Sequence, residues 1–99
     1  MTPKNWTLNT YTDETWSPIV GEPAVLATIL LTNTANAPVT VSVRLADGAT
    51  EQAIVLPPSI LQADSAYTLE LRSLCLTGDQ ALELWVDAPG VHAVASGVV

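Results

Sequence analysis

Basic residues are the scarcest feature of this 99-residue sequence. Three lysines and arginines stand against ten acidic residues, for a formal net charge of −7. Proteins that bind nucleic acid or anionic membranes need clustered positive charge to neutralise phosphates. The composition therefore predicts neither a nucleic-acid partner nor a membrane partner. Charged residues make up only 13% of the chain, about half of the usual share, which indicates that another chain covers part of the surface.

Cysteine and long apolar runs are also nearly absent. Cys75 is the single cysteine, so no disulfide can form within the chain. Its neighbours Leu74 and Leu76 predict a buried, inert thiol. The first residues contain no apolar segment typical of a signal peptide, and no run of about 18 apolar residues is present to cross a membrane. We therefore expect synthesis and first action in a reducing cytosol.

Residues for catalysis or metal binding are equally few. His92 is the only histidine, whereas a zinc site needs several ligands and a hydrolytic site needs a base, a nucleophile and an orienting acid. The position between two apolar residues predicts an ordinary strand histidine. Most acidic residues fall singly in turns or on polar strand faces, so they indicate neither a glycosidase pair nor a calcium loop. The sequence predicts no enzyme, no cofactor and no metal.

Strand signals, in contrast, are abundant. Residues 39–45 alternate apolar and polar side chains over seven positions, which places three valines and Leu45 on one face of a strand. The Asp47-Gly48 pair accepts the positive φ of a tight hairpin turn. Further apolar or alternating runs, each bounded by turn residues, predict strands at 24–32, 51–56, 60–61, 67–72, 82–87 and 91–99.

This spacing predicts an all-β protein. About seven to eight short strands, with turns roughly every ten residues, are typical of an antiparallel β-sandwich or jelly roll. Residues 1–22 are expected to form a less regular N-terminal arm or extension, and residues 23–99 the β-sandwich domain. The arm contains Trp6, Tyr11 and Trp16, three of the five aromatic residues.

Trp85 is the most informative aromatic residue. It alternates with Leu82, Leu84 and Val86, so it faces outward if those residues face the core. A large exposed aromatic side chain is a common anchor of an interface. Two other interpretations stay open: both sheet faces are covered within the monomer, or a bulge reverses the register. The predicted protein-interface residues are Trp6, Tyr11, Trp16 and Trp85.

Several stretches resemble small structural proteins of tailed bacteriophages. They are residues 27–34, 37–48, 76–86 and 90–98. The shared pattern is an apolar strand ending in Asn-Thr, a hairpin around a glycine, a Gly-Asp turn before Leu-x-Leu, and a closing Ala-Ser-Gly-Val. It covers about residues 24–98, and the pair Pro57-Pro58 departs from it. The resemblance implies a virion component and brings no catalytic residues.

The expected function follows from this resemblance. We expect a capsid decoration (cement) protein, made in the host cytoplasm and located in the virion. It would assemble as a homo-oligomer, a trimer, and stabilise the head by binding the major capsid protein or another virion protein across capsomer junctions. A neck, collar or tail-fibre module is the alternative within the virion. The alternative outside the virion is a small carbohydrate- or protein-binding domain. In a carbohydrate-binding domain, Trp85 would stack on a sugar ring.

Overall fold

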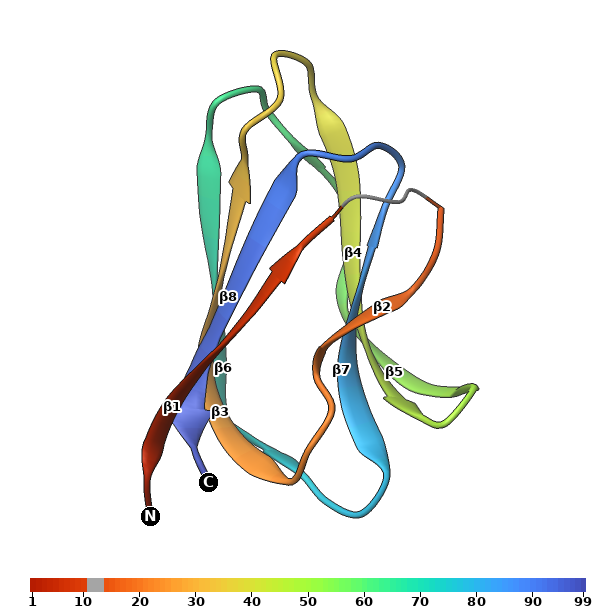
Figure 1. The fold of residues 1–99 in the computed structure, drawn as a ribbon. Helices are drawn as coiled ribbons and strands as arrows, with labels where there is room; N and C mark the ends of the chain where they lie inside the picture. The colour runs from red at the N-terminus through yellow and green to blue at the C-terminus, as the bar shows by residue number, and fades with distance from the viewer. Residues whose placement is uncertain (11–13) are drawn as a thin grey trace.

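The computed structural model describes residues 1–10 and 14–99, and in these ranges the regular structure is β-strand. Figure 1 shows the strands arranged in two facing layers. The strands are β1 (Pro3–Asn9), β2 (Ser17–Val20), β3 (Ala24–Asn33), β4 (Val39–Asp47), β5 (Thr50–Leu61), β6 (Ala66–Leu76), β7 (Gln80–Val86) and β8 (Val91–Val98).

Each layer is an antiparallel sheet of four strands. The first sheet has the order β1-β8-β3-β6, and the second sheet has the order β2-β7-β4-β5. The predicted all-β sandwich is therefore confirmed. In the described part of the chain, no helix is both long and apolar enough to span a membrane.

The hydrophobic core lies between the two sheets. In β4, the side chains of Val41 and Val43 are buried, and so are those of Val86 and Leu84, which lie opposite them in β7. The residues between them along each strand, such as Arg44 in β4 and Trp85 in β7, point to the outer face of the second sheet. The period of two residues thus sends one set of side chains into the core and the other set to the outer face.

The segment 1–22, expected as an arm, contributes an edge strand to each sheet. All of β1 pairs with β8, from Pro3 opposite Val98 to Asn9 opposite His92. β2 pairs with β7 at the edge of the second sheet. In Figure 1, β1 runs beside β8 and β2 beside β7. The two strands are thus integral parts of the two layers.

Two local predictions differ from the structure. β5 continues through Pro57-Pro58 to Leu61, because it is an edge strand and a register shift accommodates the prolines, which lack an N–H. The prediction of a buried Cys75 is wrong, since its thiol is exposed. Arg72 and Ser73 have positive φ and form a bulge in β6, after which Cys75 lies on the outer face of the first sheet.

Candidate functional site

The outer face of the second sheet brings distant residues into neighbouring rows. Ser42 in β4 lies opposite Trp85 in β7, and Arg44 lies opposite Glu83. On the other side of β7, Ser17 pairs with Leu84, so the register places the preceding residue, Trp16, beside Trp85. The residues between them in β4 and β7 face the core, so these side chains point to the outer face of the sheet.

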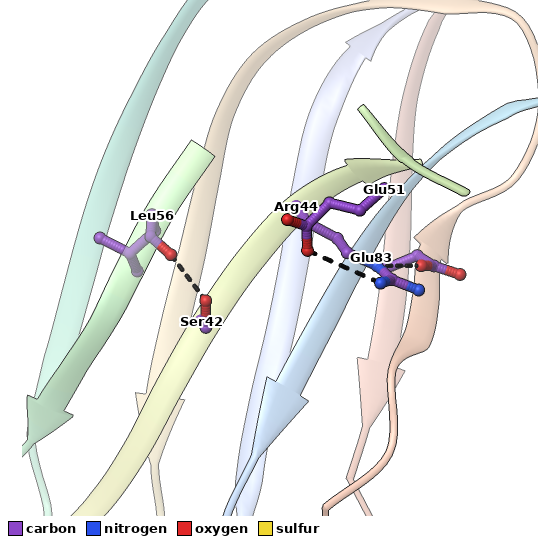
Figure 2. Close-up of polar contacts among 5 residues, drawn as sticks. All are labelled: Ser42, Arg44, Glu51, Leu56 and Glu83. Atoms are coloured by element: carbon purple, nitrogen blue, oxygen red, sulfur yellow. Dashed lines mark hydrogen bonds and ion pairs between the residues drawn. The ribbon is translucent and has the colours of Figure 1, made fainter. Parts of the chain in front are cut away.

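A pocket opens where these rows meet. Its volume is about 280 Å³, and it is lined by Trp16, Ser42, Ile54, Pro58 and Trp85. Both indole rings are half-buried, and Ile54 is exposed. Ser42 is buried, and its Oγ donates a hydrogen bond of 2.8 Å to the main-chain carbonyl of Leu56, as Figure 2 shows. We call these five lining residues the tryptophan pocket.

Arg44 fixes one wall of the tryptophan pocket. Its Nε donates to Glu83 Oε1 at 2.7 Å, and its Nη1 lies 3.7 Å from Glu51 Oε1 (Figure 2). Its guanidinium carbon lies 4.3 Å from the centroid of the Trp16 ring. Such a cation–π contact is worth about 0.5–2 kcal/mol. Trp16 lies one residue before β2, and this contact ties its ring to the central strand β4.

The four predicted interface residues have different locations. Trp16 and Trp85 are brought together in the tryptophan pocket. Trp6 is 8% exposed and packs into the core from β1, so its ring is not presented to a partner in this structure. Tyr11 lies outside the described residues.

Burial of Trp6 depends on a polar contact at the edge of the core. Its Nε1 donates a hydrogen bond of 3.0 Å to Glu22 Oε2, which also accepts one of 2.7 Å from Lys4 Nζ. The lysine ammonium lies 5.4 Å from the Trp6 ring centroid. The hydrogen bond from Lys4, and then that from Trp6, lowers the pKa of the Glu22 carboxyl. These contacts join β1 to the segment between β2 and β3.

Sequence reasoning missed Ser42, Ile54 and Pro58 as pocket residues. Alternation places Ser42 on the polar face of β4, and the Asp47-Gly48 turn predicts the β4–β5 hairpin, but neither reveals that β7 is the other neighbour of β4. Among the residues that the structure describes, no group of three or more His, Cys, Asp or Glu is placed to hold a metal ion. His92 is exposed on β8, in the first sheet.

Comparisons with known proteins give information on the fold of the chain and not on its family. No protein-family model matches it, and no curated protein matches it. A solved structure described as "Crystal structure of PirA" is similar, with a TM-score of 0.52 and 16% sequence identity. The similarity covers 97% of this chain and 94% of that chain. At this identity the likeness shows a shared β-sandwich fold and nothing about ligands.

Proposed function

We propose that this protein is a non-catalytic binding domain that holds a sugar ring against Trp16 and Trp85. The observation that carries the proposal is the meeting of two half-buried tryptophans in one outward-facing pocket, Trp85 from β7 and Trp16 from the residue before β2. Aromatic rings offer an apolar face on which the C–H face of a sugar can stack. The volume of about 280 Å³ is close to the lower limit of ligand pockets, about 300 Å³, and suits one ring of a longer glycan.

The surroundings of the pocket supply the remaining requirements of a sugar site. The carboxylates of Glu51 and Glu83 lie at its border through their contacts with Arg44, and carboxylate oxygens accept hydrogen bonds from hydroxyl groups. Trp85 and Ser42 are on central strands of the second sheet. Sites built on regular strands are held more rigidly than sites on loops, which reduces the entropic cost of binding.

The test is binding of the purified protein to a panel of neutral and charged oligosaccharides, measured by isothermal titration calorimetry. Trp85→Ala and Trp16→Ala are each expected to weaken binding by about thirtyfold, the equivalent of about 2 kcal/mol for an aromatic anchor. Tyr67→Ala is the matched control, because Tyr67 is an exposed aromatic residue on β6 of the other sheet. Failure of every neutral and charged glycan to bind would contradict the proposal.

A role as a phage capsid decoration protein is the second candidate. It is favoured by large apolar side chains exposed on both sheets, which further subunits in a particle would cover. These are Leu30, Ile54, Ile60 and Tyr67. In this proposal the protein is located in the virion, forms a trimer, and contacts the major capsid protein through Trp16 and Trp85. Light scattering coupled to size exclusion tests it: a homogeneous trimer supports assembly, whereas a monomer at high concentration contradicts the trimer.

A further inference from the structure

The basic residues are divided unequally between the two sheets. The chain has three lysines and arginines. Lys4 lies on β1 and Arg72 on β6, both in the first sheet, and the single histidine, His92, is on β8 of that sheet. Within residues 1–10 and 14–99, Arg44 on β4 is therefore the only basic residue of the second sheet. The tryptophan pocket lies on this sheet.

Acidic residues lie near the same pocket. Glu83 is two positions before Trp85 on the same face of β7, about 7 Å away along the strand, and Asp87 follows directly after the end of β7. Asp87 Oδ1 accepts a hydrogen bond of 2.9 Å from the Thr40 main-chain N–H, which holds it beside β4. The main-chain N–H of Glu14 donates one of 2.7 Å to the carbonyl of Val86, which places Glu14 beside the same end of β7.

Arg44 is already committed to contacts within the protein. Glu83, Glu51 and the Trp16 ring surround its guanidinium, and its side chain is 14% exposed. The carboxylates of Glu51 and Glu83 contact this guanidinium. Glu14 and Asp87 lie near the end of β7 that follows Trp85, so four acidic residues stand against one basic residue in this region, an excess of three negative charges. An anionic ligand would meet repulsion and find no available cation, whereas a cationic group would be attracted both by the carboxylates and by the indole faces.

We propose that the tryptophan pocket selects a basic glycan, one whose rings carry protonated amines, over neutral and acidic glycans. This inference rests on the proposed sugar-binding function and adds the charge class of the ligand. One ring stacks on Trp85, and its ammonium group lies toward the exposed Asp87, because Glu83 is already paired with Arg44. The same arrangement disfavours glycans that carry carboxylate or sulfate groups.

The experiment compares three tetrasaccharide probes by calorimetry at a pH where amines are protonated and carboxylates ionised. The probes are a glucosamine tetramer, its N-acetylated neutral form and an acidic galacturonate tetramer. We expect the glucosamine tetramer to bind at least tenfold more tightly than the neutral one at low salt. The advantage should decrease as salt rises, because the screening length falls from about 10 Å at 0.1 M to about 3 Å at 1 M. The galacturonate tetramer should bind most weakly.

Charge variants locate the effect. Asp87→Asn removes one charge and keeps the oxygen that accepts the Thr40 hydrogen bond, so it should weaken glucosamine binding about three- to tenfold and leave the neutral tetramer unchanged. Glu70→Gln, which removes an exposed charge from β6 of the first sheet, is the matched control and should change neither. Retained binding of the neutral tetramer also verifies that each variant is folded.

The outcomes separate the two proposals. Equal affinities for the glucosamine and neutral tetramers, both lost in Trp85→Ala, would overturn the charge preference and support the sugar site. Tighter binding of the galacturonate tetramer would also overturn the charge preference. No binding of any probe, or binding that Trp85→Ala leaves intact, would overturn both the sugar site and its charge preference.

Discussion

Glu22 illustrates how single side chains hold this small domain together. One of its oxygens accepts hydrogen bonds from both Lys4 Nζ and Trp6 Nε1. The second bond matters because an indole N–H at the border of the core needs a partner when the ring is buried. The carboxylate form is the better acceptor, so these bonds lower the pKa of Glu22.

The lowered pKa gives stability a defined pH dependence. Because the pKa of Glu22 is lower in the folded than in the unfolded state, its contribution is present above the ordinary value of 4.5 and lost as pH falls through the folded value. We expect Glu22→Gln to lower the Tm at neutral pH, with the difference from wild type shrinking below pH 4.5. Thermal unfolding followed by circular dichroism across a pH series measures this. Glu70→Gln is the control for the loss of one exposed charge, and a pH-independent effect of Glu22→Gln would refute the prediction.

At the scale of elements, Asn33 joins the end of β3 to the segment that follows β5. Its side chain is fully buried, and Nδ2 lies within hydrogen-bond distance of the carbonyls of Ala37, Leu61 and Gln62, at 2.9, 3.0 and 3.2 Å. Its Oδ1 accepts a bond from the Ala35 N–H. One amide thus links main-chain groups of the turn after β3 to those at the end of β5.

Removing this amide should be costly. We expect Asn33→Ala to lower the free energy of unfolding by about 2–3 kcal/mol, since the buried Leu61 carbonyl and the Ala35 N–H lose their partner. Urea unfolding followed by tryptophan fluorescence gives the value. Asn36→Ala, at an exposed position of the same turn, should change stability by less than about 0.5 kcal/mol. Similar losses in the two variants would show that the hydrogen bonds of Asn33 are not responsible.

Close packing of β3 against β8 gives a second prediction at this scale. A Cβ added at Gly97 would lie 2.2 Å from the Val25 carbonyl oxygen, where β3 has a bulge beyond Leu26. Because main-chain atoms would have to move, Gly97→Ala should destabilise the fold by about 1–3 kcal/mol. Gly21→Ala is the control, since no atom lies within 4 Å of its added Cβ. Equal unfolding midpoints in urea for the two variants would contradict the prediction.

For the molecule as a whole, the sequence predicts features that depend on local alternation and misses those that depend on strand order. The outward position of Trp85 follows from the buried Leu84 and Val86 beside it. The burial of Trp6 depends on β1 pairing with β8, its partner from the far end of the chain. The pocket depends on β7 lying beside β4 and β2, which no local pattern encodes. The bulge that exposes Cys75 depends on positive φ at Arg72 and Ser73. Neither residue is a glycine, so the sequence does not indicate this backbone conformation.

The place of β8 between β1 and β3 also determines when the protein can fold during synthesis. Both neighbours of β8 are made long before it, so the first sheet is incomplete until the last of the eight strands has left the ribosome. Folds dominated by such distant pairings form slowly, and their apolar strands are exposed to aggregation in the meantime. A translational pause before β8 would therefore prolong the period in which β1 and β3 lack their common partner.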